Sequence, residues 1–517
     1  MMALQRISGI AKADFLERVR KFSFPAFAAF LVFSVFWFVP RPSGFTGLVI
    51  EPDRFLQGSD PSWIPISSAL CGGMFLCLLG FVYIKNTVRQ DHEAGILTLV
   101  QTSSLKRSTY LFGKFLSNVC LLLLLLVFLM AASFLTMVVR FPGRFIPLQS
   151  FFSPFLCIIP GLFFVSAFAL LTDCAPVFRK NSSLSIGLYF CLFVLILTFG
   201  SLNRNPYRLT SIFDFSGFMW IHDSISRTVT AVTGQPATRI NLFSYSREAG
   251  SQLKTLVFHG LMPSASYFSD KLIMIALSLG LTGLASLLLP KSQNPVFAAA
   301  KKQMPQAIKN APARIPFFHF GLFRSQMTIL LKSQSFFWWA IAVCLWIANL
   351  FSPMDTVRSA LFPLAFVWLL PVFSKMGYLE HQTGMIIVLR TIPNAPLLQA
   401  LFCWRAGLAI SFFTSLPVLL RLFLSQNFAG FLAVIIFTIF IPTSALFLGE
   451  WTKSNRPFEI LYLILCFLMM NLPTLVFSDS SFTVQSGLRA CCFILITVGM
   501  LVLAFAARLK TICITFK

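Results

Sequence analysis

Long apolar runs separated by short polar segments dominate the sequence. A helix needs about 20 apolar residues to cross the hydrocarbon core of a bilayer, and this length predicts about twelve membrane-spanning helices. In the first half of the chain they lie near residues 23–40, 62–84, 110–138, 154–172, 184–202 and 271–290. In the second half they lie near residues 336–352, 359–375, 398–424, 429–449, 457–477 and 488–508. Because backbone polar groups in lipid must pair internally, helices are the expected form.

Composition agrees with this pattern. The chain is 57% hydrophobic and only 11% charged, with a mean hydropathy of +0.81. A soluble domain is about a quarter charged, so the apolar surface of this chain is too large for one water-soluble core. The sequence therefore predicts an all-α polytopic membrane protein. We expect it in a cell membrane, either a plasma membrane or a bacterial inner membrane.

The formal net charge of +24 first suggests a protein that binds nucleic acid. The basic residues, however, flank the predicted spans. If the N-terminus is cytoplasmic, most Lys and Arg residues fall in cytoplasmic segments, as the positive-inside rule requires. The charge pattern therefore predicts that both the N- and the C-terminus are cytoplasmic. It points to membrane lipids as partners and not to nucleic acid.

Cysteine and histidine give no sign of a disulfide framework or a metal site. None of the 12 cysteines stands in a Cys-x-x-Cys motif, and most of them lie in apolar runs. His222 and His259, in the polar segment 203–269, lack the spacing of metal ligands. We therefore expect no metal ion in this chain.

Five charged residues lie near the ends of predicted spans. Long side chains at such places reach the membrane surface, so we expect all five to lie at the interface. The lack of an acidic residue in mid-span disfavours a proton-coupled transporter. The five residues are Lys114, Asp173, Arg405, Arg421 and Glu450.

A short segment recurs in the two halves of the chain. The first copy, HEAGILTLVQTS, begins at His92, and the second, HQTGMIIVLRTI, begins 289 positions later at His381. Each copy follows the second predicted span of its half and precedes the third. The aligned pairs are Asp91 with Glu380, His92 with His381, Gly95 with Gly384, and Thr102 with Thr391. A second, gapped correspondence pairs Asp173 with Glu450 at the inner ends of spans four and ten.

Both copies predict short amphipathic helices on the cytoplasmic side. The residues that share a helical face are Ile96, Leu99, Val100 and Ser103 in the first copy, and Met385, Val388, Leu389 and Ile392 in the second. Such a helix can simply lie against lipid headgroups. Its recurrence at the equivalent place in both halves favours a specific role.

The stretch RQDHEAGILTLVQTSSLKRSTYLFGKFLSN, residues 89–118, resembles the signature of ABC-2-type transporter permeases. In that family an acidic residue is followed by Gly, a hydrophobic helix, a polar break and a basic residue that enters the third span. The segment is the coupling helix, which docks on a separate nucleotide-binding cassette. The resemblance also implies an interfacial elbow helix at the N-terminal sequence FLERVRKF.

For individual residues, the resemblance implies a coupling role in both halves. In the first half the residues assigned to coupling are Asp91, Glu93, Gly95, Ile96, Leu99 and Val100. In the second half they are Glu380, Gly384, Met385, Val388 and Leu389. Gln382 stands where the first copy has an acidic residue, so the equivalence of the two docking sites stays open.

The repeat predicts three parts of the chain. Residues 1–290 form a first six-span half that includes the extracytoplasmic segment 203–269, which could form a small capping structure. Residues 291–335, rich in Lys, Pro and Ala, form a cytoplasmic basic linker. Residues 336–517 form a second six-span half. The usual family member has one six-span unit and dimerises, so two fused units favour a monomeric permease, with a dimer of this chain left open.

A nucleotide-binding motif is missing from the sequence. A phosphate-binding loop requires G-x-x-x-x-G-K-[ST], whereas Gly113-Lys114 is followed by Phe115 and has no Gly five residues earlier. We therefore expect that this chain is not an enzyme and holds no cofactor. ATP and magnesium would belong to a partner ABC ATPase subunit, expected in two copies.

These inferences predict the permease subunit of an ABC-2-like exporter, driven by ATP hydrolysis in separate cassettes, with an apolar or amphipathic substrate. The alternative is an ion-coupled secondary transporter with a six-plus-six helix repeat.

Overall fold

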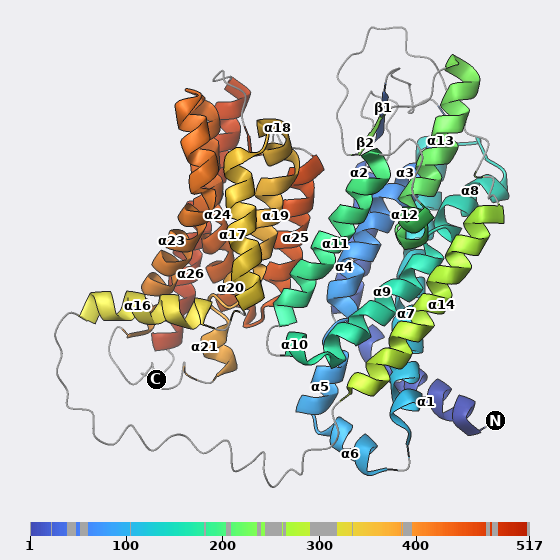
Figure 1. The fold of residues 1–517 in the computed structure, drawn as a ribbon, viewed down its shortest axis with the longest axis horizontal. Helices are drawn as coiled ribbons and strands as arrows, with labels where there is room; N and C mark the ends of the chain where they lie inside the picture. The colour runs from blue at the N-terminus through green and yellow to red at the C-terminus, as the bar shows by residue number, and fades with distance from the viewer. Residues whose placement is uncertain are drawn as a thin grey trace. The chain divides into compact units, whose positions relative to one another are not determined.

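The computed structural model describes most of the chain (Figure 1). The described residues are 2–21, 23–38, 48–51, 60–103, 105–179, 182–202, 208–234, 239–242, 261, 265–289, 318–332, 334, 336–383, 385, 395–471, 476–477 and 484–513. They are predominantly helical. Strands β1 (Leu48–Glu51) and β2 (Arg239–Leu242) form a two-stranded antiparallel ladder in which Leu48 pairs with Leu242.

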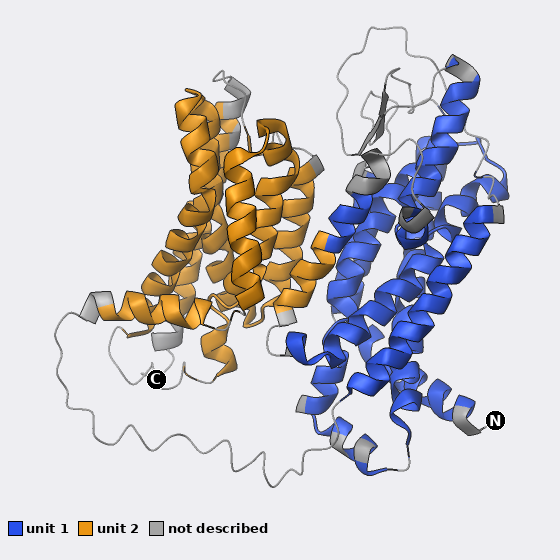
Figure 2. Ribbon diagram, in the orientation of Figure 1, with its two compact units in different colours: residues 1–179, 192–293 blue, residues 180–191, 294–517 orange. Residues whose placement is uncertain are grey.

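By its internal contacts the chain divides into two compact units (Figure 2). Unit 1 consists of Met1–Arg179 and Leu192–Gln293, and unit 2 of Lys180–Cys191 and Asn294–Lys517. The division near residue 293 falls close to the start of the predicted linker. Helix α11 (Ser182–Leu202) contributes its first half to unit 2 and its second half to unit 1.

The helices of unit 1 range in length from four residues in α10 to 34 in α7. In chain order they are α1 (Met2–Val19), α2 (Ser23–Phe38), α3 (Trp63–Ser67), the π-helical turn η2 (Ser68–Gly72), α4 (Gly73–Ile84), α5 (Thr87–Glu93), α6 (Ile96–Thr102), α7 (Arg107–Arg140), α8 (Leu148–Leu156), α9 (Ile159–Cys174), α10 (Pro176–Arg179), α12 (Arg208–Phe213), α13 (Phe218–Thr233) and α14 (Ala265–Leu288). Helix α14 packs along α9, and α9 packs against α7, so these three form the body of the unit.

The helices of unit 2 range from three residues in α18 to 30 in α23. Its helices after α11 are α16 (Phe318–Leu331), α17 (Phe336–Phe351), α18 (Met354–Thr356), the π-helical turn η4 (Val357–Leu361), α19 (Phe362–Trp368), α20 (Leu370–Phe373), α21 (Leu379–Gln382), α23 (Ala395–Leu424), α24 (Phe428–Thr452), α25 (Arg456–Asn471) and α26 (Val484–Cys513). Helix α24 packs along both α23 and α26.

Each of the twelve apolar segments predicted from the sequence overlaps one or more of the described helices. Within the described residues, eight helical stretches are long and apolar enough to cross a membrane, and the number rises to 10 if each of two bent helix pairs is one span. The other two predicted segments, 184–202 and 457–477, correspond to the shorter α11 and α25. The eight stretches are Trp63–His92, Arg107–Arg140, Leu148–Cys174, Ser266–Leu288, Met354–Phe373, Ala395–Leu424, Phe428–Thr452 and Ala490–Leu509. The count of twelve spans and the cytoplasmic placement of the termini stay predictions.

Each half of the chain contains a helix that turns sharply into an apolar one. The axes of α1 and α2 differ by 72°, and those of α16 and α17 by 100°. The sequence FLERVRKF, predicted as an elbow helix, lies at the end of α1. The second elbow was not predicted, because α16 falls inside the predicted linker 291–335. Its sequence FHFGLFRSQMTILL is apolar enough to form an ordered helix, whereas residues 291–317 lie outside the described part of the chain.

The polar segment between α11 and α14 is not only a surface loop. Phe215, between α12 and α13, is 1% exposed. Its carbonyl approaches Gly161 of α9 so closely that a Cβ there would lie 1.7 Å from the oxygen, an approach that only glycine permits. Asp214 accepts a hydrogen bond of 3.1 Å from the backbone N–H of Phe218 and so caps α13. This turn is therefore embedded in unit 1, and a capping structure formed by the segment 203–269 stays a prediction.

Candidate functional site

The first copy of the repeated segment folds as the two short helices α5 and α6. Gly95 between them has φ 76°, in the left-handed region that glycine adopts readily. Leu99 and Ile96 on α6 are 71% and 44% exposed. Leu97 is 3% exposed and belongs to a core cluster of α5, α6, α7, α9 and α14, and Val100 packs against that cluster.

The predicted apolar face of α6 is therefore divided. Ile96 and Leu99 point to the surface, whereas Leu97 and Val100 anchor the helix to the bundle. Val100 was expected to share the exposed face, and Leu97 was not identified from the sequence. The signal for Leu97 was present, since Leu97 and Val100 are three residues apart and thus lie on one helical face.

Asp91, which was assigned to the docking helix, lies on α5 with its side chain buried. It is 8% exposed, and its carboxylate contacts α7 instead of the surface. Lys114 Nζ lies 2.7 Å from Asp91 Oδ2, and the Tyr110 hydroxyl donates to the same oxygen at 2.5 Å. The backbone of Glu93 ends α5, but its side chain lies outside the described part of the structure.

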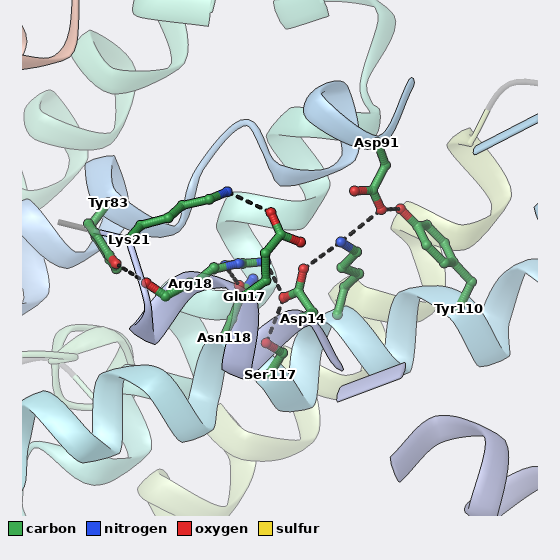
Figure 3. Close-up of polar contacts among 10 residues, drawn as sticks. Asp14, Glu17, Arg18, Lys21, Tyr83, Asp91, Tyr110, Ser117 and Asn118 are labelled. Carbon is green, nitrogen blue, oxygen red and sulfur yellow. Dashed lines mark hydrogen bonds and ion pairs between the residues drawn. The ribbon is translucent and has the colours of Figure 1, made fainter. Parts of the chain in front are cut away.

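Asp91 belongs to a buried group of polar residues that we call cluster 1 (Figure 3). The group joins α1, α5 and α7. Lys114 Nζ lies between two carboxylates, at 2.5 Å from Asp14 Oδ1 and 2.7 Å from Asp91. Arg18 forms an ion pair with Asp14. The members of cluster 1 are Asp14, Arg18, Asp91, Tyr110, Lys114, Ser117 and Asn118.

The formal charges of cluster 1 balance. Two carboxylates face one guanidinium and one ammonium group, and neutral side chains add hydrogen bonds. Ser117 donates to Asp14 Oδ2 at 2.6 Å, and Arg18 donates to Asn118 Oδ1 at 2.6 Å. Paired and hydrogen-bonded charges are the form in which charged groups are found buried. Lys114, 5% exposed, is thus a buried structural cation, and the expectation that it reaches the membrane surface is wrong.

A second acidic residue holds the start of α5. Asp173, at the end of α9, accepts a hydrogen bond of 3.0 Å from the backbone N–H of Asn86 and further ones from Thr87 and Val88. A carboxylate at this place satisfies N–H groups that have no partner within the helix. Asp173 therefore fixes the segment that follows the second span of unit 1, instead of lying free at the interface.

The second copy of the repeated segment is described only in part. Glu380, on α21, is 8% exposed, and Met385 is 52% exposed. Gly384, Val388 and Leu389 lie outside the described residues, so their assignment to a coupling helix stays a prediction. The described part matches the first copy in one respect, since a buried acid precedes an exposed apolar side chain.

Glu380 belongs to a second buried group, cluster 2, which consists of Glu380, His381, Glu450 and Arg508. The cluster joins α21, α24 and α26. Arg508 Nη2 donates to Glu380 Oε2 and to Glu450 Oε1. His381 Nε2 lies 3.3 Å from the other oxygen of Glu450. Glu450, 6% exposed, is therefore a buried partner of Arg508, contrary to the expectation that it lies at the interface.

The other two span-end charges also have defined partners. The Arg421 guanidinium donates to the carbonyls of Asn349 and Ser352, as described below, and the Arg405 guanidinium lies 5.5 Å from the centre of the Phe402 ring. Both are half-buried or exposed, so neither contradicts a place near the interface.

The turn that leads into α21 is packed tightly against α24. Gly377 has φ 71°. Gly449 on α24 lies so close to this turn that a Cβ there would be 2.2 Å from the carbonyl oxygen of Met376. Burial raises the pKa of Glu380, and the neighbouring Arg508 guanidinium opposes this rise.

Two further features recur at corresponding places in the units. The π-helical turns η2 (Ser68–Gly72) and η4 (Val357–Leu361) both interrupt the helix that precedes the repeated segment. Their starting positions differ by 289, the same offset that aligns the two copies of the segment. π-Helical turns are rare and often accompany functional sites, so a coincidence in type and register supports a duplicated architecture.

An arginine at the far end of the third long helix of each half binds the end of the first. Arg140 on α7 donates to the carbonyl of Phe36 on α2 at 2.6 Å. Arg421 on α23 donates to the carbonyls of Asn349 and Ser352 at the end of α17, at 3.0 and 2.7 Å. A cation at a helix C-terminus satisfies its carbonyl groups and interacts favourably with the helix dipole.

Within the described part of the chain, no group of three or more His, Cys, Asp or Glu side chains is arranged to hold a metal ion. The eleven cysteines of that part are free thiols. The clusters are thus sites of buried ion pairing, and the exposed residues of α6 form an apolar contact surface.

No family model matches this chain, and a search of curated proteins finds no match. The class of protein therefore follows from the fold alone. Long apolar helices and buried, internally paired charges define a multi-pass α-helical membrane protein.

Proposed function

We propose that this chain is the permease of an ABC-2-like exporter in which two six-span halves are fused and ATP is hydrolysed by separate cassette subunits. The observation that carries the proposal is the exposed apolar pair Ile96 and Leu99, on a helix held firmly to the bundle. The pair follows the second span of its half, where such permeases have their coupling helix.

The anchoring of α6 suits the transmission of force. Leu97 and Val100 fix the inner face of the helix, Asp173 fixes the start of α5, and cluster 1 ties α5 to α7 and α1. A displacement imposed on Leu99 from outside would therefore reach several long helices at once. A helix that merely lay on lipid headgroups would not require this many buried connections.

The recurrence of elements in both halves supports the fusion of two permease units. An elbow helix, a π-helical turn, a buried acid and a capping arginine recur in the same order along the chain. In the proposed arrangement the termini are cytoplasmic, twelve helices span a cell membrane, and two cassettes bind the two repeated segments. ATP and magnesium belong to the cassettes, and the cargo is apolar or amphipathic.

Leu99→Asp tests the proposal. Leu99 is already 71% exposed, so the change should leave the yield and thermal stability of the chain close to wild type. A cassette pocket that buries Leu99 would have to bury an unpaired charge, and cassette binding should fall at least about 10-fold. Affinity capture of co-expressed cassettes and vesicle transport assays measure the two effects. Met385→Asp tests the second segment in the same way.

Val177→Asp is the matched control. Val177 is 65% exposed on the short helix α10 and lies outside the repeated segment, so its substitution should leave cassette capture unchanged. If Leu99→Asp and Met385→Asp together still capture the cassette and transport as wild type does, the proposed coupling surface is wrong.

A specific observation also favours the alternative of an ion-coupled secondary transporter with a six-plus-six helix repeat. Cluster 2 places ionisable groups deep in unit 2, and buried ionisable residues often mark ion or proton pathways. This alternative predicts transport by the purified chain in vesicles with an ion gradient and no cassette. The exporter predicts none under those conditions.

A further inference from the structure

Cluster 2 has an imbalance of charge that cluster 1 lacks. The charged groups that act on Glu380 are Arg508, Glu450 and His381. Two carboxylates thus share one guanidinium, and the His381 imidazole lies 3.3 Å from Glu450. With a neutral imidazole the group carries one uncompensated negative charge.

An uncompensated charge is unfavourable where the side chains are buried in the protein. Arg508 is 0% exposed, Glu450 6% and Glu380 8%. A buried group in such surroundings takes up a proton instead of remaining charged. One proton would bring cluster 2 to neutrality, as the ion pairs of cluster 1 already do for that cluster.

We propose that cluster 2 is a proton-binding site that takes up one proton and thereby fixes α21 to α24 and α26. The site is a property of this chain alone and does not depend on the proposed exporter function. Because Glu380 and His381 belong to the second repeated segment, loss of the proton loosens the attachment of that segment. The corresponding part of unit 1 holds α5 without a proton.

Other titratable groups near the cluster act differently. Cys403, on α23, interacts electrostatically with both glutamates and with Arg508. Lys375 lies in the turn before α21, and its burial lowers its pKa to about 8. A base with a lowered pKa binds its proton less well in the folded state, so its contribution to stability grows as the pH rises. Lys453 is the C-cap residue of α24.

The contribution of cluster 2 to stability changes with pH in the direction opposite to that of Lys375. Burial raises the pKa of Glu380 above its ordinary value of 4.5. The folded state therefore binds the proton more tightly than the unfolded state does. The resulting stabilisation is complete at low pH and is lost as the pH rises through the folded-state pKa of the coupled cluster.

The experiment measures the thermal stability of the full chain in lipid nanodiscs between about pH 5 and pH 9. Two substitutions each remove the charge imbalance of cluster 2, one by loss of an acid and the other by gain of a cation. Glu450→Gln removes one acid, and His381→Arg adds a permanent cation. In wild type, the release of about one proton should lower the melting temperature as the pH rises. Each substitution should remove this decline. Infrared difference spectra should show a protonated carboxyl or imidazolium signal in wild type that both variants lack.

His92→Arg is the matched control, because His92 aligns with His381 but is exposed on α5. His92→Arg should keep the wild-type dependence of melting temperature on pH. Lys375→Gln should remove only the contribution to stability that grows as the pH rises. A purely structural role for cluster 2 would make both balancing variants less stable at every pH without changing the slope. That result, or equal slopes in wild type and His381→Arg, would overturn the proposal, and neither outcome depends on cassette binding.

Discussion

Cluster 1 and cluster 2 each pair buried acidic residues with basic side chains, but the basic residues come from different places in the two units. In each unit a short segment after an interrupted helix carries a buried acid, Asp91 in one and Glu380 in the other. In unit 1 the cation comes from α7, the next long helix, and two basic groups balance two acids. In unit 2 the cation comes from the last long helix, α26, and one Arg508 serves two acids.

The difference shows which part of the arrangement is fixed. The 289-residue offset that aligns Asp91 with Glu380 also aligns Lys114 with Cys403. Cys403 still lies close enough to Glu380 for the two to interact, but it has no charge to offer. The buried acid is thus kept in both halves, whereas the source of the positive charge has moved to another helix.

Removal of the cation should have the largest effect, and it should be larger in unit 2. Arg508→Met leaves two buried carboxylates without their guanidinium, and loss of one partner from a buried ion pair costs about 3–5 kcal/mol. Lys114→Met should cost roughly half as much, because Asp14 keeps Arg18 and Asp91 keeps the Tyr110 hydroxyl. Thermal unfolding of the purified variants at neutral pH shows which of the two substitutions is more destabilising.

The control for this pair is Arg508→Lys, which keeps a charge but loses the second donor group. It should be more stable than Arg508→Met. If Lys114→Met proves the more damaging of the two methionine variants, the view that the acids of cluster 1 keep more partners than those of cluster 2 is incorrect.

A relocated charge should partly rescue unit 2. Cys403→Lys in the Arg508→Met background places the cation where the repeat has Lys114. Neighbouring residues show coupling energies of about 0.5–3 kcal/mol in double-mutant cycles, and we expect a favourable coupling in this range. Unfolding measurements on the two single variants and the double variant give the value. Cys403→Ser, which adds no charge, should give no rescue.

The spans and the repeat could be predicted from the sequence, because both depend on local patterns. Apolar runs of membrane-spanning length located the helices, and His92 and His381 marked the two copies. The inward face of α6 was also within reach, since Leu97 and Val100 follow helical spacing. What misled the prediction was the assumption that every apolar residue of a short amphipathic helix shares one face.

The clusters could not be predicted, because their members come from distant parts of the chain. Glu380 and Arg508 are 128 positions apart, and Asp14 and Lys114 are 100 apart. From the sequence, Lys114 and Glu450 stand near span ends, where interface placement is the common outcome. Only the packing of α1 on α7, and of α26 on α24, turns these ends into buried sites.

The smallest effect is expected at an exposed ion pair at the C-terminal end of α1, the helix that contributes Asp14 and Arg18 to cluster 1. Two pairs there have the same four-residue spacing, Asp14 with Arg18 inside the helix and Glu17 with Lys21, which follows its last residue Val19. The first pair is buried, whereas the side chains of Lys21 and Glu17 are 47% and 60% exposed. Solvent and salt screen the second pair, so Lys21→Met should change the stability by no more than about 0.5 kcal/mol.

Arg18→Met, at the same spacing on the buried face, should be clearly more destabilising, because it leaves Asp14 with Lys114 alone as a charged partner among the described residues. Unfolding of both variants at low and high salt separates the two cases. Added salt should leave the Arg18 effect nearly unchanged and abolish what remains of the Lys21 effect. If the two variants have equal effects, the burial of the Asp14–Arg18 pair contributes nothing to holding α1 on α7.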